Sequence, residues 1–506
     1  MPSPLLLLPC LLLALSPAAN AQSSEIAKLE ASDADGGDQY GHSVAVDGDT
    51  AVIGAPLDEA FAFFGGSAYV AVRDGADWVE QAKLIGGSVS SSDRFGWAVD
   101  VDGDYAVVTS LFDQGASPVS GTATVFQRGG SSWSQTQILA PTDGATSDWF
   151  GRSVSIQGNT IAIGAPQDDD FGAECGSVYI YTFNGTSWIQ QSKLTAADAN
   201  AGDNFGQSVA LSGASIVIGA PFDDDAGSSS GSAYIFTFNG TSWNQQAKLT
   251  ASDASSSDSF GYGVALDGDT ALVGAYRANL GGFGSDAGAA YVYTRSAVTW
   301  SQSTKLVPAS LAAGDDCAWS VALDGEHALL SARGHANNQG SVFHFRNSVA
   351  GWVEVNELVA SDGAVGDEFS LSIDLDGERA MVGAYLHDGA GGSAGAAYLF
   401  DLFRVDVVPA APIAGQPASI NLGGGKANSM SWMAYSLNGA GSTSIAPLGV
   451  TLDLLFPSQL GSAQLTASDG SASWPIMVPA QVSGVTVWLQ GLQAGHVTNL
   501  RSLTVL

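Results

Sequence analysis

The segment Phe205-Gly206-Gln207-Ser208-Val209-Ala210-Leu211, with Gly219-Ala220-Pro221 soon after it, decides the fold because close copies recur through the chain. An aromatic residue followed by glycine stands every 55 residues over five copies, and two degenerate copies follow. Repeats of this length are supersecondary units that bury their apolar faces only against one another. The seven repeat starts are Tyr40-Gly41, Phe95-Gly96, Phe150-Gly151, Phe205-Gly206, Phe260-Gly261, Cys317-Ala318 and Phe369-Ser370, and tryptophans in the same rhythm are Trp78, Trp133, Trp188, Trp243, Trp300 and Trp352.

Each copy is predicted to hold four short antiparallel strands. In the fourth copy these strands cover residues 205–211, 215–220, 232–238 and 243–249. The second strand is apolar almost throughout, which is typical of a strand covered on both faces. Asn239-Gly240 favours a two-residue hairpin turn between the third and fourth strands. Seven such units predict an all-β protein, a seven-bladed β-propeller.

The two ends of the repeat region indicate that the propeller closes on itself. The seventh copy stops after its third strand, at residues 396–402, without the Trp and Lys-Leu strand. Glu25-Ile26-Ala27-Lys28-Leu29 supplies a matching fourth strand at the other end of the chain. Joining both ends in one blade removes exposed strand edges, so we expect residues 25–31 to pair beside residues 395–402.

The repeat motifs resemble a known family. Phe-Gly at the repeat start and Gly-Ala-Pro after the second strand, as in Gly54-Ala55-Pro56, Gly164-Ala165-Pro166 and Gly219-Ala220-Pro221, are similar to the FG-GAP repeats of integrin α-chain head domains and secreted bacterial proteins. The resemblance implies an extracellular propeller of the adhesion or recognition type over residues 22–403. Calcium-binding repeats of that family carry an Asp-rich loop between the first two strands. Here that position holds only tight turns such as Asp47-Gly48-Asp49-Thr50, so calcium ligation there is not carried over.

The N-terminus reads as a targeting segment. Leu5 to Leu15 is an apolar run too short to span a bilayer, and Ala19-Asn20-Ala21 offers a small-x-small cleavage site. We therefore expect residues 1–21 to be a signal peptide and the protein to be secreted, with attachment to the cell surface left open. Cys10 lacks a lipoprotein context, and no later segment approaches 18 consecutive apolar residues, so no membrane insertion is expected.

Composition narrows the range of partners. The chain has 50 acidic and 17 basic residues, a formal net charge of −33, and such a field repels nucleic acid. The acidity suits a solvated exterior, and cation binding is the alternative. Cys175 and Cys317 lie in different repeats, so no disulfide framework is expected, and we expect a monomer.

Loops that enter each first strand and loops that join second to third strands share one face of a propeller, because alternate connections of a meander emerge at opposite ends. This loop face should be strongly negative. One aspartate precedes each aromatic position by two residues, and we expect these carboxylates to accept backbone N–H bonds at the strand entry. The seven are Asp38, Asp93, Asp148, Asp203, Asp258, Asp315 and Asp367.

A calcium site is a weaker hypothesis for the loops after Gly-Ala-Pro in blades three and four. Asp168-Asp169-Asp170 and Asp223-Asp224-Asp225 offer carboxylates in Gly-rich loops, with Asp168, Asp170, Asp223 and Asp225 as the candidate ligands. The alternating Asp spacing of a dedicated calcium loop is missing. A solvated turn is therefore the alternative, and no cofactor is certain.

Individual function is expected where the repeat breaks. Blades five, six and seven carry aromatic and cationic residues at or just after the position of the Gly-Ala-Pro proline. The residue after each Phe-Gly also varies and should ring the central channel. Aromatic and Arg side chains are favoured in interfaces, so we expect a binding surface here, with ordinary loop drift as the alternative. The candidate ligand-binding residues are Tyr276, Arg277, Arg333, His335, Tyr385, His387, Trp97 and Trp319, and the variable positions are His42, Trp97, Arg152, Gln207, Tyr262, Trp319 and Leu371.

Motifs for catalysis are scarce. The six His residues show no metal-ligand spacing, and neither a Gly-x-Ser-x-Gly motif nor a phosphate-binding loop occurs. We therefore expect a non-enzymatic protein that binds an extracellular protein or glycan ligand. The alternatives are a secreted hydrolase of polysaccharide or protein, acting through carboxylates on the loop face, and a purely structural matrix component.

The C-terminal part lies outside the repeats. Residues 404–417 read as a linker, and short alternating stretches in residues 418–506 predict a small accessory β-sandwich. Trp432, Trp474 and Trp488 fit its core better than a sugar-binding platform.

Overall fold

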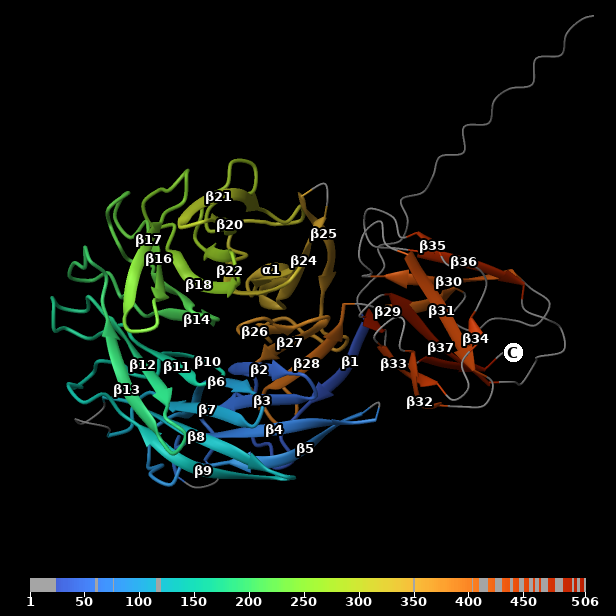
Figure 1. The fold of residues 1–506 in the computed structure, drawn as a ribbon, viewed down its shortest axis with the longest axis horizontal. Helices are drawn as coiled ribbons and strands as arrows, with labels where there is room; N and C mark the ends of the chain where they lie inside the picture. Colours follow the sequence, from blue (N-terminus) through green and yellow to red (C-terminus); the bar gives the residue numbers. More distant parts are fainter. Residues whose placement is uncertain are drawn as a thin grey trace, which may run out of the picture.

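The computed structural model describes residues 24–59, 62–75, 77–114, 120–348 and 351–402, and beyond them the backbone of strands between residues 404 and 504. Residues 24–402 form seven four-stranded antiparallel sheets arranged as blades around a centre (Figure 1). The fold is a seven-bladed β-propeller, which confirms the sequence-based prediction.

Blades one to four contain strands β2 (Ser43–Asp47), β3 (Thr50–Ala55), β4 (Ser67–Asp74), β5 (Asp77–Leu84); β6 (Phe95–Asp102), β7 (Tyr105–Ser110), β8 (Thr122–Gly129), β9 (Ser132–Leu139); β10 (Ser153–Gln157), β11 (Thr160–Ala165), β12 (Ser177–Phe183), β13 (Trp188–Leu194); β14 (Ser208–Ser212), β15 (Ser215–Ala220), β16 (Ser232–Phe238) and β17 (Trp243–Leu249). Blades five to seven contain β18 (Phe260–Asp267), β19 (Thr270–Ala275), β20 (Ala289–Ser296), β21 (Thr299–Leu306); β22 (Cys317–Asp324), β23 (His327–Ala332), the short helix α1 (His335–Asn338), β24 (Ser341–Ser348), β25 (Gly351–Leu358); and β26 (Ile373–Asp376), β27 (Arg379–Ala384), β28 (Ala396–Asp401) and β1 (Ser24–Leu29).

The chain ends close the ring as the sequence predicted. Strand β1 pairs antiparallel with β28, with Lys28 opposite Tyr398 and Leu29 opposite Ala397. The Glu25 side chain also accepts a bond of 2.8 Å from the backbone N–H of Ser361. A Gln or Glu of the fourth strand accepts the same bond in the other six blades, so the N-terminal strand completes blade seven with the contacts of an ordinary blade.

Adjacent blades meet backbone to backbone at the two glycine motifs. A Cβ atom on Gly219 of the Gly-Ala-Pro in the fourth repeat would lie 1.8 Å from the carbonyl oxygen of Gly261, which follows Phe260 in the next blade. Gly54 meets Gly96 in the same way between blades one and two. The Phe-Gly glycines also have positive φ, 91° for Gly261, a region that suits glycine. The two motifs therefore recur together because their glycines meet across four of the seven interfaces, at Gly54–Gly96, Gly164–Gly206, Gly219–Gly261 and Gly383–Gly41.

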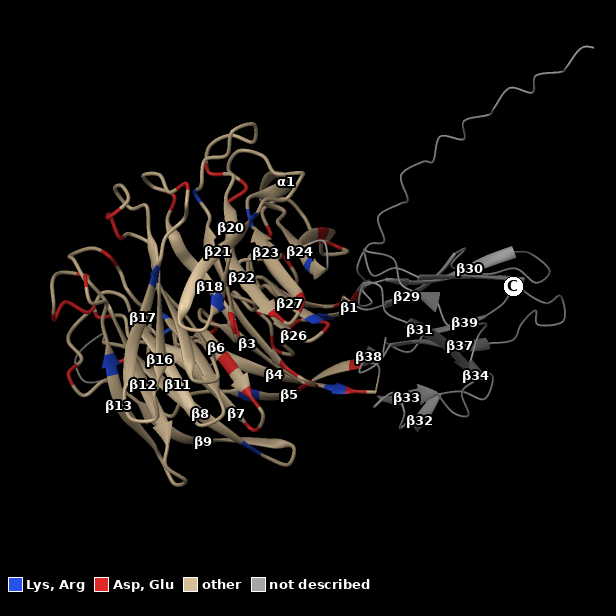
Figure 2. Cartoon of the chain, turned by 45° about the horizontal axis from the view of Figure 1, so that its top comes forward, with Lys and Arg blue, Asp and Glu red and all other residues tan. Residues whose placement is uncertain are grey.

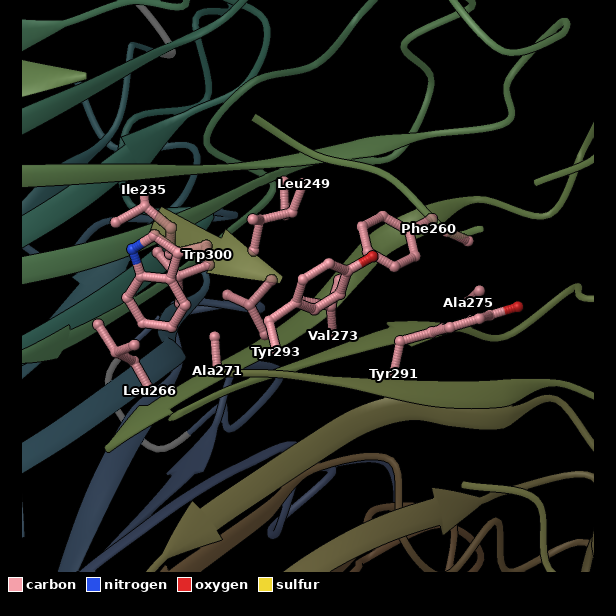
Figure 3. Close-up of a cluster of buried hydrophobic side chains, with 14 of the residues drawn as sticks. Ile235, Leu249, Phe260, Leu266, Ala271, Val273, Ala275, Tyr291, Tyr293 and Trp300 are labelled. Atoms are coloured by element: carbon pink, nitrogen blue, oxygen red, sulfur yellow. The ribbon is translucent and has the colours of Figure 1, made fainter. Parts of the chain in front are cut away.

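Apolar side chains fill the space between blades. Figure 3 shows one such cluster, in which Ile235 and Leu249 of blade four pack with Phe260, Tyr293 and Trp300 of blade five. Phe260 is fully buried, and its ring centroid lies 5.5 Å from that of Tyr291 in a T-shaped contact. Phe150, Phe205 and Phe369 make equivalent contacts in their blades. The repeated aromatic residue is thus a core side chain in six of the seven blades, and the buried Cys317 takes its place in blade six.

The innermost strands are sheet edges, and side chains of the preceding blade satisfy their free N–H groups. Asp47 accepts a bond of 2.6 Å from the N–H of Gly103 in blade two. Equivalent bonds link all seven blades, including Gly48 of blade one to Asp376 of blade seven at 2.7 Å. The tight turns between first and second strands therefore carry Asp, Gln or Ser for a structural reason.

Two details of the fourth copy differ from the prediction. Strand β14 begins at Ser208 instead of residue 205, because Phe205 forms a parallel bridge with Gly176 of the preceding blade. Residues 239–242 form a four-residue loop in place of a two-residue turn, since Phe238 pairs with Trp243. The Asn239 side chain accepts bonds from the N–H groups of Thr241 and Ser242, and this local capping competes with the tighter turn.

The C-terminal part is also made of strands. The strands are β29 (Arg404–Val408), β30 (Pro417–Gly423), β31 (Met430–Ser436), β32 (Ala440–Ile445), β33 (Val450–Leu454), β34 (Ser458–Gln459), β35 (Gln464–Leu465), β36 (Ala472–Met477), β37 (Thr486–Gln493), β38 (His496–Val497) and β39 (Arg501–Thr504). They pair antiparallel in sheets of three, six and two strands. Residues 404–408, expected within a linker, instead pair with β30, and alternate valines at Val405 and Val407 account for the strand. The sandwich itself stays a prediction.

Other expectations fall outside the described residues. The predicted signal peptide, residues 1–21, and the side chains of Trp432, Trp474 and Trp488 belong to that group. Of the helices in the described part, none has the length and apolar character needed to cross a membrane.

The blade interface can be tested at Gly219. We expect Gly219→Ala to lower the free energy of unfolding by about 3 kcal/mol or more, because the added Cβ meets backbone that cannot rotate away. Gly213→Ala is the control: nothing lies within 4 Å of its added Cβ, and only its positive φ of 58°, which Gly219 does not share, should cost about 1 kcal/mol. Thermal and denaturant unfolding followed by circular dichroism measures both, and equal losses would contradict the interface contact.

Candidate functional site

A channel of about 770 Å³ runs through the centre of the propeller, lined by the first strands of all blades. The residue that follows each Phe-Gly position lines this channel in every blade, as the sequence predicted. These residues are His42, Trp97, Arg152, Gln207, Tyr262, Trp319 and Leu371. They stand at the start of each first strand, so they surround the channel end on the loop face, which we call the channel mouth.

Aromatic side chains of blades five and six stack on one side of the channel mouth. The ring centroids of Tyr262 and Trp319 lie 4.3 Å apart, and Tyr276 packs 4.7 Å from both. The guanidinium of Arg333 lies 3.7 Å from the Trp319 centroid, and it pairs with Asp316 at 3.2 Å. Tyr276 is buried, not exposed as the sequence suggested, because these rings cover it. This side of the mouth is therefore aromatic, and Asp316 balances the charge of Arg333.

The opposite side of the channel mouth carries cations around Trp97. The guanidinium groups of Arg94 and Arg152 lie 5.6 and 5.8 Å from the Trp97 ring centroid, and the His42 ring lies 4.6 Å from it. Burial, together with the charges of Arg152 and Arg94, lowers the pKa of His42 to about 4. His42 is therefore neutral at pH 7, and Tyr385 approaches it edge-on at 6.0 Å.

Two carboxylates lie deeper in the channel, at matching positions of blades two and seven. Burial and the neighbouring Asp374 raise the pKa of Asp100 to about 8, and burial raises the pKa of Asp374 to about 6. Asp100 accepts bonds from the backbone N–H groups of Ile156 and Val101. Asp374 accepts one of 2.7 Å from Val46. Both carboxylates thus complete the inner-strand contacts between blades.

The other sequence-predicted residues of blades five to seven lie away from the channel lining. His335 Nδ1 contacts Asp315 Oδ2 at 2.7 Å, and His387 Nδ1 contacts Asp367 Oδ2 at 2.9 Å. These histidines occupy the loop position that holds a buried aspartate in blades one to four. Arg277 is exposed beside Tyr276. Of the eight candidate residues, the structure therefore brings Trp97, Trp319, Arg333 and Tyr385 together around the channel.

The aspartates of the proposed calcium loops surround lysines. Lys248 Nζ lies 2.7, 2.8 and 2.5 Å from carboxylate oxygens of Asp198, Asp223 and Asp225. In blade three, Lys193 Nζ contacts Asp143, Asp168 and Asp170 at 3.0, 2.7 and 2.6 Å. The three carboxylates in blade four lie within 4.8 Å of one another, a spacing that a metal ion could also use. An ion there would have to displace the lysine, and the calcium hypothesis stays a prediction.

The repeated aspartates before the aromatic residues act as predicted. Each accepts a bond from the backbone N–H three residues earlier, with Asp203 to Asn200 at 2.7 Å as an example. The same bond occurs in the other six blades. Burial raises the pKa of Asp203 to about 6. These residues shape the loops and are structural.

Sequence reasoning missed a buried histidine pair in blade six. His327 Nδ1 lies 2.7 Å from His344 Nε2, and His327 Nε2 lies 3.1 Å from Glu378 of blade seven. Burial lowers the pKa of His344 well below its usual range. The two residues are 17 apart in sequence and meet only because β23 and β24 pair, so spacing alone gave no signal. Cys175 and Cys317 are buried free thiols.

The fold and the channel mouth define a seven-bladed propeller of the binding and recognition type. FG-GAP repeats match residues 23–71, 78–126, 133–181, 188–236, 243–293, 300–345 and 352–400, and the chain belongs to this repeat family. From the second copy onward each match begins at the repeated tryptophan, in a fourth strand, and the first begins just before β1. No curated protein matches the chain.

The lysine-centred loops can be tested with calcium. We expect the melting temperature of the unmodified protein to be the same in calcium and in chelator, because the Lys248 ammonium already occupies the space between the three carboxylates. In Lys248→Ala we expect calcium to raise the melting temperature, since the carboxylates then repel one another and leave oxygen ligands free. Lys248→Arg is the control that keeps the charge. A calcium-dependent rise in the unmodified protein would instead support the calcium hypothesis.

The channel carboxylates predict a pH dependence. Because the pKa of Asp100 is raised in the folded state, the folded protein binds this proton more tightly than the unfolded chain, and stability falls as pH rises from about 4 through about 8. We expect Asp100→Asn to flatten that slope, so that its stability relative to the unmodified protein improves as pH rises from about 4 to about 8. Unfolding at each pH measures this, with exposed Asp74→Asn as the control. Parallel curves for Asp100→Asn and the unmodified protein would refute the assignment.

Proposed function

We propose that this protein is a non-enzymatic, extracellular recognition protein that binds a protein or glycan ligand through the loop face of its propeller. The observation that supports this most is the channel mouth, where partly exposed Trp97, Trp319, Tyr385, Arg152 and Arg333 converge from four blades. Aromatic and Arg side chains provide large contact areas and oriented hydrogen bonds at low cost in side-chain entropy.

The rigidity of the propeller favours recognition. Trp97, Arg152 and Trp319 stand at the starts of first strands, and Arg333 and Tyr385 directly follow second strands. Hydrogen bonds between blades and buried aromatic residues fix these strands on both sides. A ligand would therefore meet side chains that are already placed, and little ordering would oppose binding. The channel volume of about 770 Å³ lies in the range of small-ligand sites, so a chain end or side group of a larger ligand fits it.

The hydrolase alternative depends on carboxylates of altered pKa, and Asp100 and Asp374 meet that description. Their oxygens, however, accept backbone N–H bonds between blades. A structural role explains both the burial and the raised pKa, and no observation requires a catalytic one. Many of the other acidic residues lie in the propeller loops (Figure 2), where Lys193 and Lys248 pair with carboxylates of blades three and four.

Secretion and a monomeric state complete the proposal. Secretion rests on the apolar run and small-residue cleavage site of residues 1–21. A closed ring supports a monomer, because it leaves no blade without a fourth strand to invite pairing with a second chain.

A ligand screen tests the proposal. We expect the purified chain to be retained on an array of glycans and matrix proteins, and Trp319→Ala and Arg333→Ala to weaken that binding about tenfold or more, because each removes an anchor at the channel mouth. Trp133→Ala is the matched control, since Trp133 follows the hairpin at the opposite end of blade two. Retention that survives both mouth variants, or no retention on any ligand, would contradict the proposed binding face.

A further inference from the structure

The pairing of cations in this acidic protein is uneven. Fourteen Lys and Arg side chains lie in the described part of the propeller, and eleven of them pair with a carboxylate within 4.0 Å. Within those described residues, Arg94, Arg152 and Arg277 make no such pair. Acidic residues outnumber basic ones by 50 to 17, so cations without a carboxylate partner are an unusual feature of this chain.

Two of these three arginines lie together in the channel mouth. Arg94 and Arg152 come from blades two and three, and both guanidinium groups approach Trp97. Arg94 also lies 4.9 Å from the Phe112 ring centroid, while Arg152 Nη2 reaches across to the Tyr262 hydroxyl at 3.4 Å. Aromatic contacts fix both guanidinium groups without neutralising them, so their charge remains for a ligand.

The positive character of this spot is local. The same two arginines help to lower the pKa of His42, which lies beside Trp97. Deeper in the channel the lining turns acidic, with Asp47, Asp102 and Asp376. An anion would therefore be held at the mouth beside Trp97 and repelled from the interior.

We propose that Arg94, Arg152 and Trp97 form an anion subsite that binds the carboxylate of an acidic sugar, such as a hexuronate residue at the end of a polysaccharide. This assignment rests on the proposed function and narrows it to one ligand chemistry and one side of the channel mouth. Two unpaired guanidinium groups suit a carboxylate, because each offers parallel N–H donors in a planar fork.

A sugar fits the surroundings better than an acidic peptide. The flat C–H face of a pyranose ring can pack on an indole, and Trp97, Phe112 and Trp149 form a run of rings with centroids 6.4 Å apart. Gln39, Gln207 and Tyr262 line the same mouth and supply donors and acceptors for ring hydroxyls. An Asp or Glu side chain offers neither a flat face nor hydroxyls for these groups.

The test is a titration of the full chain with three probes: an oligosaccharide of hexuronic acid, a neutral hexose oligosaccharide of the same length, and an oligoglutamate peptide. We expect the hexuronate probe to bind at least tenfold more tightly than the other two. We expect Arg94→Ala and Arg152→Ala each to weaken it about tenfold, the range for losing a hydrogen bond to a charged group. Arg152→Lys should recover part of the loss, because it restores the charge without the fork.

Arg73→Ala is the control, because it removes an equal charge at the opposite end of blade one. Equal binding of the peptide or of the neutral sugar would overturn the assignment to an acidic sugar. Hexuronate binding that is unchanged in both arginine variants would overturn the subsite. If the array finds a ligand that depends on Trp319 while hexuronate does not bind, this inference fails and the proposed function stands; if no probe or array ligand binds, both fail.

Discussion

The backbone contact between adjacent blades is the constraint on which the rest of this structure depends. Gly219 and Gly261 bring two backbone segments so close that no side chain fits between them. The same contact joins Gly383 of blade seven to Gly41 of blade one. That last contact requires a closed ring. The ring in turn fixes the spacing of the seven first strands, and so the width and lining of the channel.

The inner strands separate structural from variable positions. Along each first strand, alternate side chains such as Ser43, Asp47 and Asp100 accept N–H bonds from the next blade and are held to polar residues. The position after Phe-Gly lies outside this hydrogen-bond pattern. It is therefore free to be His, Trp, Arg, Gln, Tyr or Leu, and recognition residues can change there without disturbing the ring.

This separation explains what could be read from the sequence. The period of the repeat was enough to predict the number of blades, the closure by β1 and the position of Trp97 and Trp319 at the channel. Each of these features is a property of one repeat that is copied seven times. The partners of individual side chains could not be read in that way. His335 contacts Asp315, which is 20 residues earlier in the sequence. Tyr276 is buried against Tyr262 and Trp319. Lys248 pairs with Asp198, which is 50 residues away. These contacts depend on loop geometry and on neighbouring strands.

The ion pairs of individual side chains describe the charge of the loop face better than the amino-acid composition does. The acidic composition predicted a strongly negative loop face. In the folded chain, lysines such as Lys193 and Lys248 lie among the loop carboxylates and pair with them. A carboxylate of a ligand would be repelled by the average field of this protein, so an attractive site must be local and close. Arg94 and Arg152 satisfy that condition because aromatic rings, not carboxylates, hold their guanidinium groups. Their positive charges therefore remain at the channel mouth of a protein whose net charge is negative.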